Sequence, residues 1–252
     1  MPEFPNIPVF VITVGSFVDR HRHIRKYEEK FGCDFHYILD FDAVDIDHGS
    51  LPWAVDRSLP LASQSNALKH IQAQKLLLQC SEGIGLVIED DVIFVDNFVD
   101  RLRSCLLAAK NLSPGFLVFL GGEDNKVARS FFEAKSNDLI ESPLTTAEAY
   151  LIDRAGCERR LKSLHNRTID RQADHLIKLL DEELGIRHYR PASPLATQGS
   201  ITGLFRTSLD GSRGSKWAWY LGARFRWNVF RNQTIPRGFM RLREFFRGGR
   251  KC

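Results

Sequence analysis

Short runs of apolar residues recur along the first half of the chain, with helix-like segments between them. The runs at residues 8–14, 35–41, 85–88 and 116–122 have the length and composition of strands covered on both faces in a parallel sheet. Apolar residues at helical spacing follow Asp19 as far as Gly32, fill residues 63–79 and resume after Asp96. The pattern predicts strands and helices in alternation.

The second half continues the alternation less regularly. It predicts a short strand around Phe131, a strand at 149–152, and helices at 153–164 and 172–184. Together these elements predict an α/β domain over residues 1–209, in which a mostly parallel central sheet is flanked by helices. Residues 210–252 are predicted to be a basic, aromatic extension with helical character.

The stretch GLVIEDDVIF, residues 85–94, places three carboxylates directly after a predicted buried strand. Adjacent negative charges at a buried position disfavour one another, so we expect a cation beside them. Alternate residues of a strand share a face, which would point Glu89 and Asp91 one way and Asp90 the other. Such a pair suits Mg²⁺ or Mn²⁺, with a substrate diphosphate completing the shell. The alternatives are a helix cap or a turn facing solvent.

Composition indicates a folded protein and excludes several familiar enzyme classes. Hydrophobic residues make up 43% of the chain, which is ordinary for a globular core, and the five separated cysteines are interpreted as reduced packing residues. The sequence has no apolar window that could span a membrane and no signal-peptide start, so we expect a cytoplasmic protein. It contains no GxxxxGK[ST], GxGxxG, GxSxG or HExxH motif, which argues against P-loop and Rossmann nucleotide sites, serine hydrolases and zinc proteases.

Charge separates the end of the chain from the rest. Residues 206–252 hold 12 lysines and arginines against two acidic residues, while the whole chain carries only +4. Phe239, Leu242, Phe245 and Phe246 recur there at helical spacing among arginines, a pattern suited to anionic lipid headgroups. We therefore expect contact with a membrane surface, at the inner face of the plasma membrane. In the alternative, the aromatic residues pack on the domain. Nucleic acid is not expected, because no DNA- or RNA-binding module precedes the tail.

Seven segments occur in an order and spacing that is similar to a known family. They are VFVITV with the following Asp19 and Arg20, FDAVD (41–45), ALKHIQAQ (67–74), VIEDDV (87–92), TTAEAYLIDRAGCERRL (145–161), RQADHLI (171–177) and PLATQGSITGLFRTSL (194–209). Together they resemble glycosyltransferase family 25, the lipooligosaccharide-type sugar transferases. VIEDDV resembles the family's acidic metal motif, and His70 stands at the position of its motif histidine.

The resemblance implies a GT-A fold and inverting transfer of a sugar from a nucleotide-sugar donor. The donor is expected to be a UDP-hexose and the acceptor a glycan or lipid-linked saccharide of lipopolysaccharide or another surface polysaccharide. The cofactor implied is Mn²⁺ or Mg²⁺, held by Asp91 with help from Glu89. This agrees with the independent interpretation of the acids, since a divalent cation would stabilise the leaving nucleoside diphosphate.

An inverting displacement also needs a carboxylate that takes the proton of the acceptor hydroxyl, and further residues are expected to bind the donor. Asp174 is expected to be the catalytic base, with Glu148 as the second choice, and donor binding is expected from Asp19, Arg20, His70, Asp90, Gln198 and Ser200. Gln198 and Ser200 would lie in a loop over the donor. Other roles remain open on the residues alone: Asp19 as a helix N-cap, His70 as a packed core histidine, and Asp174 as a partner of the helix dipole.

Two other functions compete with sugar transfer. A nucleotidyltransferase of similar fold would also use paired acids and a metal, but would take a nucleoside triphosphate and release pyrophosphate. A non-catalytic glycan-binding or scaffold protein would turn over no donor, and substitution of Asp174 would leave its binding unchanged.

Overall fold

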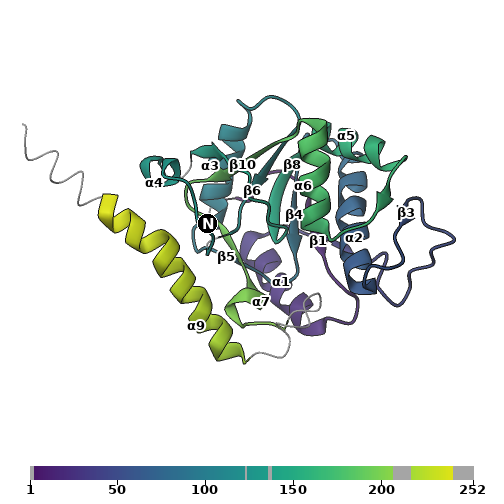
Figure 1. The fold of residues 1–252 in the computed structure, drawn as a ribbon, viewed down its shortest axis with the longest axis horizontal. Helices are drawn as coiled ribbons and strands as arrows, with labels where there is room; N and C mark the ends of the chain where they lie inside the picture. The colour runs from purple at the N-terminus through teal and green to yellow at the C-terminus, as the bar shows by residue number, and fades with distance from the viewer. Residues whose placement is uncertain (1–2, 123, 136–137, 207–216, 241–252) are drawn as a thin grey trace, which may run out of the picture.

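The computed structural model of the protein describes residues 3–122, 124–135, 138–206 and 217–240. Within these residues, seven strands form one central mixed sheet with helices on both faces (Figure 1). In spatial order, the strands are β2 (His36–Ile38), β1 (Val9–Ile12), β4 (Ile84–Glu89), β8 (Ala149–Asp153), β6 (Phe116–Phe119), β10 (Arg187–Pro191) and β7 (Leu139–Glu141). All of these described strands run the same way except β8 and β7, so the predicted α/β class and mostly parallel sheet are confirmed.

Helices cover the two faces of the sheet. They are α1 (Val18–Phe31), α2 (Leu61–Leu77), α3 (Phe98–Ala109), α4 (Ser130–Glu133), α5 (Arg154–Leu164), α6 (Ala173–Leu184), α7 (Gly199–Thr202) and α9 (Ala218–Val229), the last followed by a π-helical turn, η1 (Phe230–Thr234). Two small sheets pair β5 (Val92–Phe94) with β11 (Ala196–Gln198) and β3 (Ala54–Val55) with β9 (Thr168–Ile169).

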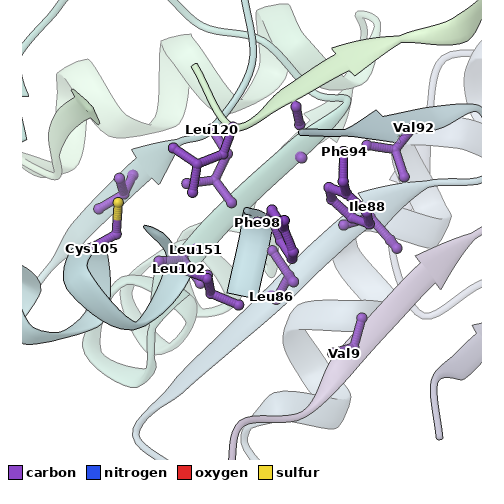
Figure 2. Close-up of a cluster of buried hydrophobic side chains, with 14 of the residues drawn as sticks. Val9, Leu86, Ile88, Val92, Phe94, Phe98, Leu102, Cys105, Leu120 and Leu151 are labelled. Atoms are coloured by element: carbon purple, nitrogen blue, oxygen red, sulfur yellow. The ribbon is translucent and has the colours of Figure 1, made fainter. Parts of the chain in front are cut away.

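Successive side chains of the central strands divide between two hydrophobic layers. Val9 and Val11 of β1 pack with residues of α1 and α3, in the layer that Figure 2 shows around Phe98 and Leu102. Phe10 and Ile12 pack with residues of α2, α5 and α6 on the opposite face. Both faces are therefore covered, which explains why these strands are continuous apolar runs in the sequence.

The strand β8 is antiparallel to both of its neighbours. β6 ends at the same edge of the sheet as β4, and β8 starts from that edge. β8 therefore begins beside the end of β4, with Ala149 opposite Ile88. This reversal brings Glu148 next to Glu89, whose N–H donates to the Glu148 carbonyl at 2.9 Å.

Several local predictions are wrong. Phe131 lies in the short helix α4, and not in a strand. Asp19 does not cap α1: the N-cap residue is Phe17, and it makes no side-chain capping bond. Gly32 does end α1, with the left-handed φ of 65° that glycine adopts without strain. Gln198 and Ser200, which were expected in a loop, end the strand β11 and lie in the short helix α7, and the strand β10 was not predicted.

The helix α9 forms an arm beside the domain (Figure 1). We define the arm as residues 217–240, which are helical from Ala218 onward. The predicted aromatic face at the chain end reaches Phe239 in the described residues, while Leu242, Phe245 and Phe246 lie outside them. No helix in the described part of the chain has the length and apolar character needed to cross a bilayer.

Candidate functional site

The three consecutive acids lie where β4 ends at the carboxyl edge of the sheet. Glu89 is the last residue of β4, and Asp90 and Asp91 form the turn into β5. Because the strand stops at Glu89, side chains no longer alternate, and the prediction that Asp90 points away from the other two acids is wrong. All three line one cavity, and they are only 8%, 3% and 2% exposed, so they do not form a turn facing solvent.

The cavity has a volume of about 220 Å³ and collects residues from five parts of the chain. Of the predicted site residues, it is lined by Arg20, Glu89, Asp90, Asp91, Gln198 and Ser200. The segment between β1 and α1 supplies Thr13 and Phe17, and α2 supplies Asn66 and Lys69. Three carboxylates thus face two cationic side chains, so the lining carries a net negative charge when all of them are ionised.

Asp90 is held by the residue that follows β1 and by a residue of α1. The Thr13 hydroxyl donates to its Oδ2 at 2.7 Å, and Arg20 donates to its Oδ1 at 2.5 Å. Arg20 is nearly enclosed, and a second guanidinium nitrogen donates to the carbonyl of Arg206. Burial raises the pKa of Asp90, while Arg20 and Thr13 act in the opposite direction. The predicted site residue Arg20 therefore fixes the position of an acid in the cavity wall.

Glu89 accepts hydrogen bonds from both sides of the cavity. Asn66 of α2 donates to Oε1 at 3.2 Å, and Gln198 donates to Oε2 at 2.9 Å. His70 lies behind the acid, with its Nε2 3.7 Å from Glu89 Oε1 and its Nδ1 3.0 Å from the Tyr150 hydroxyl. Burial acts to raise the pKa of Glu89, but His70 and Asn66 outweigh it and lower the pKa below its usual value.

Asp91 keeps one oxygen without a hydrogen-bond donor among the described residues. Its Oδ2 accepts the N–H of Ser200 at 2.9 Å, and its carbonyl accepts the N–H of Gly199 at 2.8 Å. Its Oδ1 is buried and unpaired. Burial, and then the charge of Glu89, raise the pKa of Asp91 to about 7. A cation beside this oxygen would stabilise the ionised form of Asp91, which burial and Glu89 disfavour.

Glu148 is an enclosed neighbour of the acids and does not line the cavity. Its Oε1 accepts the N–H of Gly122 at 2.7 Å. Burial is the main cause that raises its pKa to about 7, and the charge of Glu89 adds to the shift. The side chain occupies space that only a glycine leaves, because a Cβ on Gly121 would stand 1.8 Å from Glu148 Oε1.

We expect Gly121→Ala to displace Glu148 and to destabilise the protein by about 1–3 kcal/mol, since the clash strains a packed interior and breaks a buried hydrogen bond. Gly83→Ala is the matched control, because a Cβ there meets no heavy atom within 4 Å. Urea unfolding of both variants measures the difference. Equal stability of the two variants would show that Glu148 moves aside without cost.

Besides Glu148, three predicted site residues lie outside the cavity wall. Asp19 is exposed on α1 and its carboxylate pairs with Arg22 at 2.9 Å, so the geometry does not support donor contact there. His70 is 2% exposed and reaches the site only through Glu89. Asp174 lies in the first turn of α6, half-buried. Because α6 leads into β10, its first turn stands at the same edge of the sheet as the acids.

Sequence reasoning missed Thr13, Asn66 and Lys69. Thr13 directly follows β1, and polar residues at the carboxyl ends of parallel strands are a signal for a site. Asn66 precedes His70 by four residues on α2, which puts both on one helix face, so the histidine could have led to it. Lys69 is buried and pairs with Asp42 at 2.6 Å; its partner lies 27 residues away in a loop, and no local pattern reveals the pair.

The donor set fits a hard divalent cation better than zinc. The available ligand atoms are the carboxylate oxygens of Glu89 and Asp91, and Asp91 Oδ1 is buried without a hydrogen-bond donor among the described residues. Mg²⁺ and Mn²⁺ use one or two protein carboxylates together with water and substrate phosphate. In the described ranges, no three His, Cys, Asp or Glu side chains are grouped as a complete metal cage. Such a cation would therefore need oxygens from a ligand.

Comparisons with known proteins add little to this geometry. No family model and no curated protein matches the sequence. Among solved structures, one match is to the inositol-1-phosphate CTP transferase from T. maritima, with a TM-score of 0.36 and 8% identity, covering 87% of this chain and 76% of that chain. A likeness this distant identifies neither the family nor the reaction of this chain.

Proposed function

We propose that the protein is a metal-dependent, inverting glycosyltransferase with a GT-A fold. It transfers a hexose from a UDP-sugar to a glycan or lipid-linked saccharide in the synthesis of lipopolysaccharide or another surface polysaccharide. The reaction class comes from the resemblance to glycosyltransferase family 25. The observation that supports it most directly is the buried group of three acids at the carboxyl edge of an α/β sheet, with Asp91 Oδ1 unpaired among the described residues.

The residues around the acids divide into ligands and supports. Glu89 and Asp91 would hold Mn²⁺ or Mg²⁺, which when bound offsets the negative charge that develops on the leaving diphosphate. Gln198 and the Ser200 N–H fix the orientation of these carboxylates. Asp90 would stay out of the metal shell, because its Oδ1 is already paired with the cation of Arg20, whereas Glu89 accepts hydrogen bonds only from the neutral amides of Asn66 and Gln198.

The proposed base is a carboxylate that takes the proton of the acceptor hydroxyl. Asp174 is partly accessible and lies at the carboxyl edge of the sheet, the same edge as the acids, so an acceptor can reach it. Glu148 has a pKa raised to about 7, which suits a base at neutral pH, but its side chain is enclosed. Access therefore favours Asp174, and Glu148 is the second choice.

The size of the cavity limits what it encloses. At about 220 Å³ it is smaller than typical small-molecule sites of roughly 300–1,000 Å³. It would enclose the cation and the diphosphate, while the sugar and the acceptor lie toward its mouth. The two cations of the wall, Arg20 and Lys69, are already paired with Asp90 and Asp42, which favours a metal-bridged diphosphate over a metal-free triphosphate.

Thermal unfolding of the wild type with Mn²⁺, with UDP and with both together tests the proposal. A ligand that binds only the native state adds about 2.7 kcal/mol at a hundredfold excess over its Kd, which raises Tm by several degrees. We expect UDP to stabilise the protein only when Mn²⁺ is present. Asp91→Ala should lose this effect, and Asp19→Ala, an exposed aspartate outside the cavity, should keep it.

The same assay separates the competing functions. If neither ligand shifts the wild type, the proposal is wrong for UDP-sugars. If a nucleoside triphosphate with a sugar phosphate yields pyrophosphate, the protein is a nucleotidyltransferase. If UDP-sugars bind but no donor is consumed with any glycan, and Asp174→Asn leaves glycan binding unchanged, the protein is a non-catalytic binder.

A further inference from the structure

The arm turns amide side chains toward the domain and aromatic side chains toward solvent. Asn232 donates to the Asp124 carbonyl and Gln233 to the Asn125 carbonyl, each at 2.7 Å. Asn232, Gln233 and Leu221 are buried. A surface helix ordinarily buries its apolar stripe and exposes its polar face. In the arm, two amide side chains are buried while most of the aromatic side chains are exposed.

The outer face is dominated by large apolar and aromatic residues. Those of the arm that are exposed are Trp217, Trp219, Tyr220, Trp227, Phe230, Ile235 and Phe239. Trp219 is 67% exposed and Trp227 is 58% exposed. Single exposed aromatic residues are normal, but several on one surface helix indicate an interaction site. Something apolar should cover this face when the protein functions.

The sequence spacing places the aromatic residues in one stripe with arginines beside it. Spacings of seven and eleven residues return a helical side chain to nearly the same side, and these relate Tyr220 to Trp227 and Trp219 to Phe230. Arg224 and Arg226 are exposed and flank the stripe. Residues 217–240 contain four arginines and no aspartate or glutamate. The face is therefore aromatic and positively charged, and no acidic residue of the arm neutralises its arginines.

The arm is fixed to the domain close to the acids, so its outer face is displayed in a defined direction. α7, which donates to Asp91, packs against the first turns of α9. Contact there is close: a Cβ on Gly203 would stand 2.3 Å from the Ala218 carbonyl oxygen, and one on Gly222 would stand 2.9 Å from that of Thr202. The exposed stripe is thus not the result of a loosely attached helix.

A groove at the far end of the arm has the same combination of chemistry. It lies between the arm and the α4 region and is lined by Lys126, Arg129 and Arg231 together with Phe132, Phe239 and Met240. Arg129 is paired with Glu133 in an exposed salt bridge, so Lys126 and Arg231 supply most of the positive charge of the groove. Cationic side chains beside aromatic and methionine side chains suit a ligand in which a phosphate is attached to an apolar chain.

We propose that the outer face of the arm docks on an anionic membrane surface. Tryptophan and tyrosine favour the boundary between headgroups and acyl chains, and arginines bind the anionic headgroups. A second copy of the chain fits this face poorly, because a symmetric contact would bring arginines of both copies together without acids. The proposal rests on the arm alone and does not depend on sugar transfer by the cavity.

Flotation with lipid vesicles tests the docking. The full chain is mixed with vesicles of phosphatidylcholine alone, or of equal parts phosphatidylcholine and phosphatidylglycerol. We expect binding only to the anionic vesicles, and weaker binding as salt is raised. Arg224→Gln/Arg226→Gln should lower the partition constant by about thirtyfold, as expected for two arginines near an anionic surface. Trp219→Ser/Trp227→Ser should remove most of the binding.

Matched variants distinguish docking from general surface effects. Arg22→Gln/Lys26→Gln removes the same charge from exposed positions of α1, and Leu107→Ser removes an exposed apolar side chain of α3. Both should bind vesicles as the wild type does. Tryptophan fluorescence adds a direct readout, since Trp53 is buried and the other three tryptophans of the chain lie in the arm. Their emission should shift to shorter wavelength with anionic vesicles.

Several results would overturn the proposal. Equal binding to neutral and anionic vesicles would show that the arginines do not contribute to binding. If the α1 control loses as much binding as the arginine variant of the arm, the effect would depend on net charge and not on the arm. Self-association that Trp219→Ser/Trp227→Ser abolishes, without vesicle binding, would assign the face to a second copy. Binding of a single-stranded oligonucleotide without vesicle binding would assign it to nucleic acid.

Discussion

Asp91→Asn is expected to stabilise the metal-free protein above pH 7 and to have little effect on its stability near pH 4. The carboxyl is 2% exposed, and burial together with Glu89 raises its pKa from 3.8 to about 7. The native state therefore holds a proton that the unfolded chain releases near pH 4. Asparagine has the same shape, keeps an oxygen for the Ser200 N–H and never ionises.

The direction of the pH effect follows from the number of protons that each state binds. Between about pH 4 and pH 7 the native protein binds more protons at Asp91 than the unfolded protein, so its stability falls as pH rises. Above pH 7 the full cost is present and amounts to about 4 kcal/mol for a shift of about three pKa units. Asp91→Asn removes this cost, so its advantage over wild type should grow across the same interval.

Urea unfolding at pH 4, 6 and 8 in the presence of a chelator measures this effect, with Asp19→Asn as the control because its carboxylate is exposed. The gain in stability should be confined to the Asp91 variant. Adding Mn²⁺ at pH 8 should then stabilise wild type and leave Asp91→Asn unchanged. A wild-type protein as stable at pH 8 as its variant, without metal, would mean that Asp91 ionises in the native state at little cost.

Arg160→Met is expected to destabilise the protein by about 3–5 kcal/mol, because it leaves a buried carboxylate without its main partner. Arg160 of α5 is 1% exposed and forms a forked pair with Asp181 of α6, in which its Nε lies 2.6 Å from Oδ1. His188 of β10 contacts the second carboxylate oxygen at 2.5 Å. The three side chains join two helices to the sheet.

Urea unfolding at pH 7 measures this loss against Arg129→Met, which breaks an exposed pair with Glu133. The control should change stability by no more than about 0.5 kcal/mol, since solvent screens a pair on the surface. Arg160→Met/Asp181→Leu should recover most of the loss, because an apolar pair no longer buries a lone charge. A loss in Arg160→Met no larger than in the control would show that water reaches Asp181.

The α/β architecture could be predicted because its signals are local. Buried strands such as residues 9–12 are short apolar runs, and α1 ends at Gly32 as its sequence indicates. The prediction failed where tertiary contacts override the local pattern. The β10 sequence, RHYRP, was not predicted to be a strand, yet it is one because it pairs with β6 on one side and β7 on the other.

The candidate site was predictable to the same extent. Consecutive acids after an apolar run predict a cation site from charge alone, and the structure places all three acids in one cavity with Arg20, Gln198 and Ser200. The sequence did not reveal all of the side chains that hydrogen-bond to those acids. Asn66 contacts Glu89 across 23 positions of the chain, and such a contact leaves no periodicity in the sequence.

By itself, the sequence determined the alternation of strands and helices, the acids at the end of a strand and the basic, aromatic tail, because each depends on neighbouring residues and their period. The tertiary structure alone decided that β8 runs back beside β4 and brings Glu148 to Glu89. It also decided that the arm buries its amides and exposes its tryptophans. These features depend on contacts between distant residues, and their free energies are set by burial and pairing in the folded chain.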